Sequence, residues 1–160
     1  MSPIELLNEL NYFFEKFDEI IDSYGMERIK TIGDAYMAVS GVPISNENHA
    51  VHAVSAALAI QKMVYSKNLP NQNSNLPIWD LRIGIHSGPV IAGVVGKKKF
   101  AYDIWGDTVN LAARLESSGE VGKVNISGSV YQKVKEHFQF EYRGKIAAKN
   151  KGHIDMYFVY

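Results

Sequence analysis

The chain has 160 residues, 46% of them hydrophobic, which is enough to fill one core of ordinary size, so we expect one domain over residues 1–160. Seventeen Lys and Arg balance seventeen Asp and Glu, so the overall charge favours neither nucleic acid nor an anionic membrane as a partner. The lack of cysteine excludes disulfides and Cys-ligated zinc, and without a signal-peptide pattern or a long apolar run we expect a cytoplasmic location.

Capping signals and the spacing of apolar residues predict the elements in chain order. Ser2 and Glu5 have capping-box spacing, Pro3 suits the first helical position, and Gly33-Asp34 is a two-residue loop with glycine first, as a type II′ hairpin turn requires. The predicted elements are helices over 3–24, from Asn46 to Tyr65, from Asp107 through Leu115 and from Ser129 to His137, with Asn46 and Asp107 as N-caps; a surface loop over 66–77; and strands over 28–32, 35–39, 79–85, 90–96, 100–105, 124–127, 138–142 and 156–160. This order indicates an α+β domain.

Polar residues in three places are candidates for chemistry. The hairpin turn presents the carboxylate of Asp34 at the end of two strands, which suits a hard cation such as Mg²⁺, although Gly-Asp is also simply favoured turn chemistry. Lys30 lies on a strand, where a lysine usually belongs to a solvated outer face. Asn110 and Arg114 are four residues apart on one helix face and could share a ligand, or could be a solvent-facing Asn and an ion-paired Arg.

Two other patterns carry less weight. The glycines between Gly88 and Gly96 lack the ending of a P-loop and the spacing of a dinucleotide fingerprint. The five histidines show no metal-ligand spacing, so we interpret them as surface or packing residues.

Four stretches taken together resemble the catalytic domain of class III adenylyl and guanylyl cyclases, in the family's order over nearly the whole chain. They are residues 30–38 (Lys-Thr-Ile-Gly-Asp-Ala-Tyr-Met-Ala), 82–88 (Arg-Ile-Gly-Ile-His-Ser-Gly), 102–110 (Tyr-Asp-Ile-Trp-Gly-Asp-Thr-Val-Asn) and 149–152 (Lys-Asn-Lys-Gly). Four motifs at the right separations outweigh the neutral interpretation of each one. The resemblance implies a ferredoxin-like fold, with an antiparallel-rich sheet on which helices pack.

The resemblance also implies an activity, the conversion of ATP to 3′,5′-cyclic AMP and pyrophosphate. Two Mg²⁺ or Mn²⁺ ions would help the 3′-hydroxyl lose its proton and would offset charge on the reacting phosphate. The implied site residues are Asp34 as the second of two metal-binding aspartates, Lys30 and Asp103 at the base, Asn110 at the ribose, and Arg114 and Lys149 at the triphosphate.

Hydrogen bonding argues for the choice of base. Adenine offers a donor at N6 and an acceptor at N1, which suit the carboxylate of Asp103 and the ammonium of Lys30, whereas guanine reverses this edge. Guanylyl cyclases carry Glu and usually Cys or a similar small residue at these places. The two residues therefore favour ATP, because mispaired polar groups can reject the wrong base strongly.

The family's sites form between two catalytic domains arranged head to tail. Because this chain matches both sets of site residues, the resemblance implies a homodimer with a second copy and two equivalent sites. A regulatory domain or membrane anchor would lie upstream.

The chain departs from the family pattern at its start. The family begins with a strand that ends in a Phe-x-Asp-Ile pattern and carries the first metal aspartate, and nothing before the predicted helix matches it. We therefore expect an N-terminally truncated domain with little activity of its own, whose open sheet is rescued by swapping, rearrangement or association with another copy. At Asn150 the family usually has glycine. Two alternatives stay open, a guanylyl cyclase and a non-catalytic cyclase-fold module that binds nucleotide or dimerises.

Overall fold

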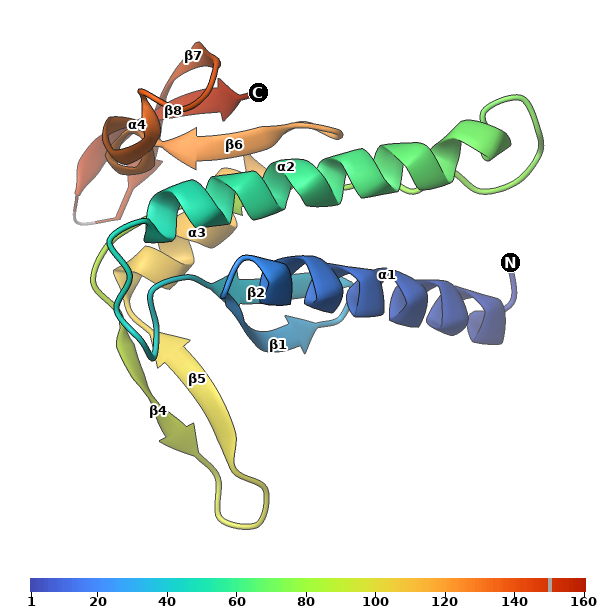
Figure 1. Cartoon of the computed structure of the whole chain (residues 1–160), viewed down its shortest axis with the longest axis horizontal. Helices are drawn as coiled ribbons and strands as arrows, with labels where there is room; N and C mark the ends of the chain where they lie inside the picture. Colours follow the sequence, from blue (N-terminus) through green and yellow to red (C-terminus); the bar gives the residue numbers. More distant parts are fainter. Residues whose placement is uncertain (150) are drawn as a thin grey trace.

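The structure is a computed structural model that describes residues 1–149 and 151–160, so Asn150 lies outside the described residues. Four α-helices, one short 3₁₀ helix and eight strands follow one another along this part of the chain (Figure 1). In order they are α1 (Pro3–Ser23), β1 (Glu27–Ile32), β2 (Ala35–Val39), α2 (His49–Asn68), η1 (Leu69–Asn71), β3 (Ile83–Ile85), β4 (Ile91–Val95), β5 (Ala101–Trp105), α3 (Asp107–Ser117), β6 (Val124–Ser127), α4 (Gly128–Val134), β7 (Phe140–Ala148) and β8 (Gly152–Val159).

The strands form three separate sheets within the described residues. β1 pairs with β2, β4 pairs with β5, and the remaining four strands form a sheet in the order β3-β6-β8-β7. All pairings are antiparallel except the parallel pair of β3 and β6. The predicted α+β architecture, rich in antiparallel strands, is confirmed, and its sheet is divided.

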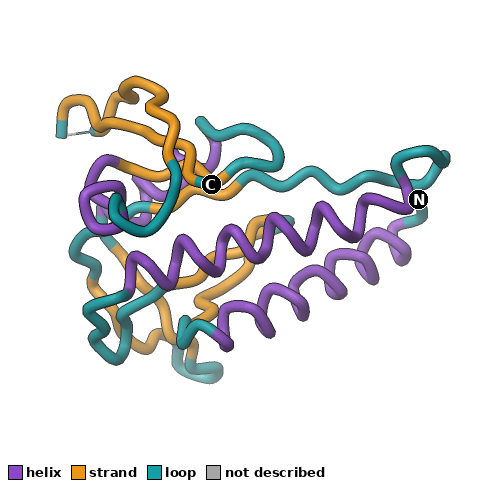
Figure 2. Tube along the Cα trace, turned by 45° about the horizontal axis from the view of Figure 1, so that its top comes forward, coloured by secondary structure: helices purple, strands orange, loops and turns teal. Residues whose placement is uncertain are grey.

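Two hydrophobic clusters hold these pieces together, and α2 contributes to both. Its N-terminal half packs through Val54 and neighbouring alanines on β6, β8 and α4. Its C-terminal half packs through Ile60 and Val64 on the aromatic face of α1, where Phe13 and Phe17 are buried. Figure 2 shows the two long helices side by side. Helix α2 is therefore the element that joins the β1–β2 hairpin and α1 to the four-stranded sheet.

The structure confirms two local sequence signals, the capping box at the start of α1 and the glycine turn between β1 and β2. The Ser2–Glu5 capping box is present in both directions, and Gly33 has a φ of 59°, a positive value at the first turn position. The N-caps of the next two long helices were predicted wrongly. Asn48 precedes α2 and Gly106 precedes α3, so Asp107 is the first helical residue.

Strand lengths differ from the prediction where pairing partners are distant in sequence. Only Ile83–Ile85 of the predicted strand over 79–85 is paired, because β6 meets β3 over three residues. β7 and β8 are longer than predicted, because their ladder runs from the Phe140–Val159 pair to the Ala148–Gly152 pair. The motif that contains Lys149 thus lies at the turn of a long hairpin.

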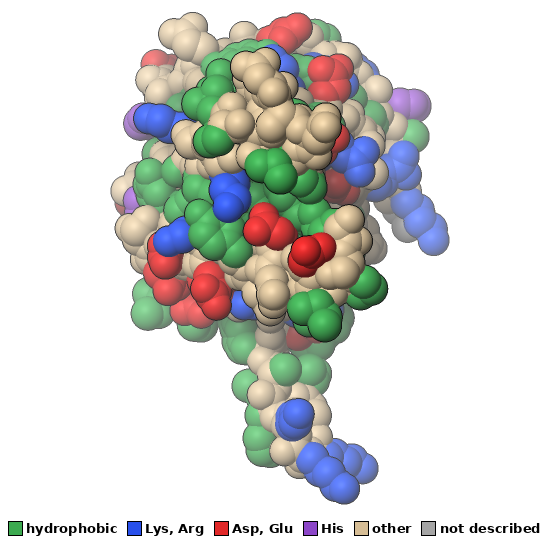
Figure 3. Space-filling view, turned by 90° about the vertical axis from the view of Figure 1, so that its right-hand side faces the viewer, with side chains coloured by type: hydrophobic (Ala, Val, Ile, Leu, Met, Phe, Trp, Pro, Cys, Tyr) green, Lys and Arg blue, Asp and Glu red, His purple; other side chains and the backbone are tan. Residues whose placement is uncertain are grey.

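The β4–β5 hairpin projects away from the helices (Figure 1). Its tip carries Lys97, Lys98 and Lys99, which form the blue end of the extension in Figure 3. Large apolar side chains along it are exposed, and Ile91 and Phe100 keep 71% and 75% of their accessible surface. None of the helices in the described part of the chain has the length and apolar character of a membrane span.

Candidate functional site

The two predicted base-reading residues, Lys30 and Asp103, are in direct contact. Lys30 on β1 donates a hydrogen bond from Nζ to Oδ2 of Asp103 on β5, over 2.8 Å. The other carboxylate oxygen accepts the backbone N–H of Ile104. The Lys30 hydrogen bond and then the Ile104 amide lower the pKa of Asp103, so this carboxylate is ionised at neutral pH. The exposed fraction of the two side chains is 43% for Lys30 and 14% for Asp103, so the pair can be reached from solvent.

A second polar contact fixes the hairpin that carries Lys30. Asp18 on α1 accepts hydrogen bonds from the hydroxyl of Tyr36 on β2, at 2.6 Å, and from the guanidinium of Arg28 on β1, at 3.0 Å. Burial, followed by the bond to Asp18, raises the pKa of Tyr36, so its hydroxyl keeps the proton that it donates. The aromatic rings of Phe14 and Phe17 pack against Tyr36. Helix α1 therefore sets the position of both strands of the β1–β2 hairpin.

Helix α3 presents Asn110 and Arg114 to solvent on one face, as predicted, while Leu111 and Leu115 are buried beneath it. At its first turn, the buried Thr108 donates a hydrogen bond to the carbonyl of Pro89 over 2.7 Å. Buried apolar side chains and this buried hydroxyl hold the helix at a defined depth. The amide of Asn110 and the guanidinium of Arg114 therefore lie one helical turn apart on the exposed face of α3.

The helix also approaches the sheet closely at Gly84 of β3. A Cβ built at this glycine would overlap the backbone nitrogen of Glu116, and it would lie 2.7 Å from the carbonyl oxygen of Ala112. Only a glycine leaves room for the helix backbone at this point. Gly84, the first of the two glycines in the 82–88 motif, thus has a packing role beneath α3.

The remaining predicted residues lie elsewhere. Asp34 is exposed at the β1–β2 turn, and Lys149 is exposed beyond the end of β7. In Figure 1 the β1–β2 turn lies near the middle of the molecule, and the turn-side ends of β7 and β8 lie at its left edge. One chain therefore brings Lys30 to Asp103 and Asn110 to Arg114, and it keeps Asp34 and Lys149 apart.

Asp34 offers a single exposed carboxylate at the β1–β2 turn. Across residues 1–149 and 151–160, no three acidic, His or Cys side chains gather as a metal site would require. An exposed aspartate at a turn suits a hard cation. The described residues of one chain do not by themselves fit two ions.

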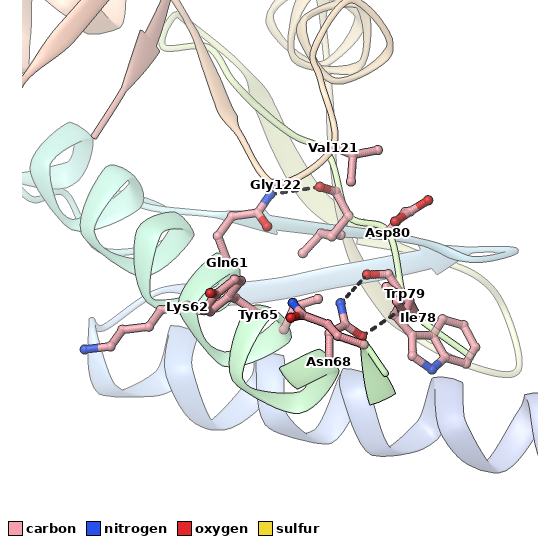
Figure 4. A pocket seen from close by; sticks show the side chains of 12 residues that line it. Gln61, Lys62, Tyr65, Asn68, Ile78, Trp79, Asp80, Val121 and Gly122 are labelled. Carbon is pink, nitrogen blue, oxygen red and sulfur yellow. Dashed lines mark hydrogen bonds between the residues drawn. The ribbon is translucent and has the colours of Figure 1, made fainter. Parts of the chain in front are cut away.

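A cleft of about 420 Å³ lies away from all of these residues, between the end of α2 and the segments that precede β3 and β6 (Figure 4). Two of the amide side chains that line it make hydrogen bonds. Asn68 bonds the backbone N–H and carbonyl of Trp79, and Gln61 donates to the carbonyls of Leu81 and Lys123. These amides tie the edge of the sheet to α2, so the cleft is a structural joint.

A polar cluster around His86 was missed by the sequence prediction, which interpreted all histidines as surface or packing residues. His86 Nδ1 lies 2.7 Å from Oγ of the buried Ser127, and His49 Nε2 lies 3.0 Å from Oγ of Ser87. Ser129 donates to the backbone carbonyl of Ser87. The loop after β3 is thereby bonded to α2 and to both ends of the β6–α4 junction.

Known proteins match this chain over nearly its whole length. A curated adenylate cyclase of Mycobacterium bovis is 40% identical over 151 residues, which cover 94% of this chain and 33% of that protein. The human guanylate cyclase soluble subunit beta-2 is 42% identical over 159 residues, which cover 99% of this chain and 25% of that protein. The chain thus spans about a third or less of the length of these relatives.

A solved structure matches the fold. The guanylate cyclase domain of RhGC from Catenaria anguillulae, in complex with GTP, superposes with a TM-score of 0.89 at 36% sequence identity, over 100% of this chain and 86% of that chain. The family model described as adenylate and guanylate cyclase catalytic domain matches residues 1–160. By its sequence, by its fold and by the motifs that place Lys30, Asp103, Asn110 and Arg114, the chain belongs to the class III adenylate and guanylate cyclase catalytic domain family.

Proposed function

We propose that this domain converts ATP to 3′,5′-cyclic AMP and pyrophosphate. The observation that supports ATP is the contact between Lys30 and Asp103. Lys30 has three N–H donors, one of which is used by Asp103, and each oxygen of the carboxylate has a free acceptor site beyond the bond that it already accepts. The pair can therefore donate to adenine N1 and accept from the N6 amino group while it stays intact.

The pair would also select against guanine. Guanine presents an acceptor at O6 and a donor at N1, so the same placement of ammonium and carboxylate would leave polar groups mispaired once the bound base covers them. A site built for one hydrogen-bonding edge rejects the other strongly, because unpaired polar groups keep their cost of desolvation. Because each side chain holds the other in place, little reorganisation is needed when the base enters.

The exposed face of α3 would hold the sugar and the reacting phosphate. Asn110 would orient the ribose so that its 3′-oxygen faces the α-phosphorus. Arg114 offers a planar fork of donors to the α-phosphate oxygens, where charge develops as the new bond forms and the bond to pyrophosphate breaks. Lys149 would bind the triphosphate. The contribution of these residues is thus positioning and charge stabilisation.

The separation of Asp34 from Lys149 supports a site shared by two copies. A homodimer would bring Asp34 of one copy to the α3 face of the other and would form two equivalent sites. Exposed apolar side chains on the β4–β5 hairpin, Ile91 and Phe100 among them, provide surface of the kind that protein partners cover.

We expect the activity to require Mg²⁺ or Mn²⁺, the requirement of class III cyclases in general. Two ions together would lower the cost of charge on the reacting phosphate. Asp34 would supply one ligand, and further ligands would have to come from outside the described residues of one chain.

Parallel assays with ATP and GTP in the presence of Mn²⁺ test the proposal, on the 160 residues and on any longer natural form of the protein that contains them. We expect cyclic AMP as the main product, and a loss of at least about 10-fold in kcat/KM for ATP in Asp103→Ala, on the basis of one charged hydrogen bond. Lys16→Gln, in an exposed ion pair on α1, serves as the matched control. A preference for GTP would overturn our assignment of the base.

The guanylyl cyclase alternative is favoured by the human relative and by the GTP complex of the matching structure. The same pair of assays decides it. Persistent inactivity of a folded, extended protein with either nucleotide would instead support the non-catalytic module, in which one metal aspartate does not organise two ions.

A further inference from the structure

The centre of the four-stranded sheet contains a polar side chain that the proposed reaction does not use. Asn125 lies in the middle of β6, between β3 and β8, and is 0% exposed. The neighbouring Val124 and Ile126 point into the hydrophobic cluster beneath α2. Because side chains alternate along a strand, Asn125 points to the opposite face, where α3 lies. A buried amide is costly unless it makes hydrogen bonds, so its position asks for an explanation.

The amide of Asn125 completes the last turn of α3. The N–H groups of Ser118 and Gly119 bond the carbonyls of Arg114 and Glu116, and the Leu115 carbonyl between them accepts Nδ2 of Asn125 over 2.9 Å. The last carbonyls of a helix need partners from outside it, and here one of them is supplied by the sheet. The second atom of the amide, Oδ1, is buried without a hydrogen-bond partner among the described residues.

The contact is built jointly with Gly84. Gly84 and Asn125 are paired in the parallel ladder of β3 and β6. The glycine admits the helix backbone, and the asparagine beside it bonds the same turn of the helix. Arg143 on β7 donates a hydrogen bond to the carbonyl of Ser118, the C-cap residue of α3, over 2.8 Å. Three strands therefore hold the C-terminal turn of α3 against the sheet.

We infer that Asn125 is a positioning residue for Arg114, and this rests on the proposed function. Arg114 precedes Leu115, so the bond from Asn125 fixes the backbone from which the guanidinium extends to the phosphate. The buried Oδ1 of Asn125 has no partner in the described part of the chain and therefore costs free energy. An apolar residue of the same shape would avoid that cost, but it would leave the Leu115 carbonyl without its hydrogen bond to the sheet. A misplacement of about 1 Å at a reacting group can lower the rate by about 100-fold.

The first test measures the helix itself. Asn125→Leu has a similar shape and no amide, and Met156→Leu is the matched control, because Met156 Sδ is the other contact of the Asn125 amide, at 3.4 Å. In hydrogen–deuterium exchange we expect the amides of α3 after residue 113 to lose about 10-fold in protection in Asn125→Leu, and those of β7 and β8 to be unchanged. Unchanged protection of α3, or an equal loss throughout the protein, would overturn the inference.

The second test asks whether the effect passes through Arg114. With ATP and Mn²⁺ we expect Asn125→Leu to lower kcat by about 10- to 100-fold with a smaller change in KM. In an Arg114→Ala background the same substitution should change kcat by less than about twofold, because the group that it positions is gone. If Asn125→Leu lowers kcat by the same factor with and without Arg114, its role is merely structural and the inference is overturned.

If a longer wild-type protein turns over neither nucleotide, this contradicts the proposed function alone, since little activity is expected of the 160 residues by themselves. The exchange experiment then decides whether Asn125 holds the C-terminal turn of α3.

Discussion

Nζ of Lys30 lies 2.8 Å from Oδ2 of Asp103, and this ion pair connects the β1–β2 and β4–β5 hairpins, which share no ladder of backbone hydrogen bonds. The two residues are 73 positions apart in the sequence. The ion pair thereby links the β1–β2 hairpin, whose turn contains Asp34, to β5, the strand that leads into α3.

Removal of the lysine should be visible in the titration of its partner. In Lys30→Ala we expect the pKa of Asp103 to rise toward its ordinary value of 3.8, because the Lys30 hydrogen bond is the largest cause that lowers it. A ¹³C NMR titration of the aspartate carboxyl groups measures this. Lys145→Ala, which removes one of the two hydrogen-bond donors to Asp155, is the control, and an unmoved Asp103 would show that the pair does not form in solution.

The wild-type pair should also be sensitive to acid. Because the pKa of Asp103 is lowered in the folded protein, its contribution to stability is present above the ordinary value of 3.8 and is lost as the pH falls through the folded value.

Gly84→Ala should destabilise the protein by about 3 kcal/mol or more, because the new methyl group would overlap the backbone of α3. Chemical denaturation measures the free energy of unfolding. Gly93→Ala on β4 is the matched control, since its Cβ would lie 3.9 Å from the nearest atom of Trp105, and we expect a change within about 0.5 kcal/mol. Equal effects at both positions would contradict the close approach of α3 to β3.

Tyr36→Phe should lower the free energy of unfolding by about 1.5–3 kcal/mol, the usual range for a hydrogen bond to a charged group. The hydroxyl is half-buried and donates to Asp18 over 2.6 Å. Glu19→Gln, which breaks the exposed ion pair with Lys16, is the control and should change stability by less than about 0.5 kcal/mol. If Tyr36→Phe is as stable as the wild type, the hydrogen bond to Asp18 does not anchor the β1–β2 hairpin on α1.

His86 should make stability depend on pH between neutral and mildly acidic conditions. Burial, and then the charge of Lys151, lower the pKa of His86 below its ordinary value of 6.5, so the folded state binds fewer protons than the unfolded state. The free energy of unfolding should therefore fall as the pH drops below about 6.5. Denaturation of the wild type and His86→Gln at pH 7 and pH 5 measures this.

His137→Gln, at an exposed position after α4, is the control for that experiment. We expect the control to keep the wild-type dependence on pH and His86→Gln to show a weaker one. An equal dependence in all three proteins would rule out His86 as its source.

The sequence by itself determined the elements whose signals are local. The capping box of Ser2 and Glu5 and the glycine-first turn at Gly33 act within a few residues, so the start of α1 and the β1–β2 hairpin could be predicted without any partner in space. The helical spacing of Asn110 and Arg114 likewise determined that they share a face. The motifs determined the family, since their order along the chain needs no coordinates.

Only the tertiary structure decided which distant groups meet. The contacts of Lys30 with Asp103 and of Asn125 with Leu115 join elements whose positions depend on the packing of α1 and α2 and on strand order. The limits of β3, β7 and β8 were decided in the same way, because a strand is as long as the partner that pairs with it. A buried asparagine in an apolar strand has no local signal at all, and it becomes intelligible only when the carbonyl that it bonds is brought to it by the fold.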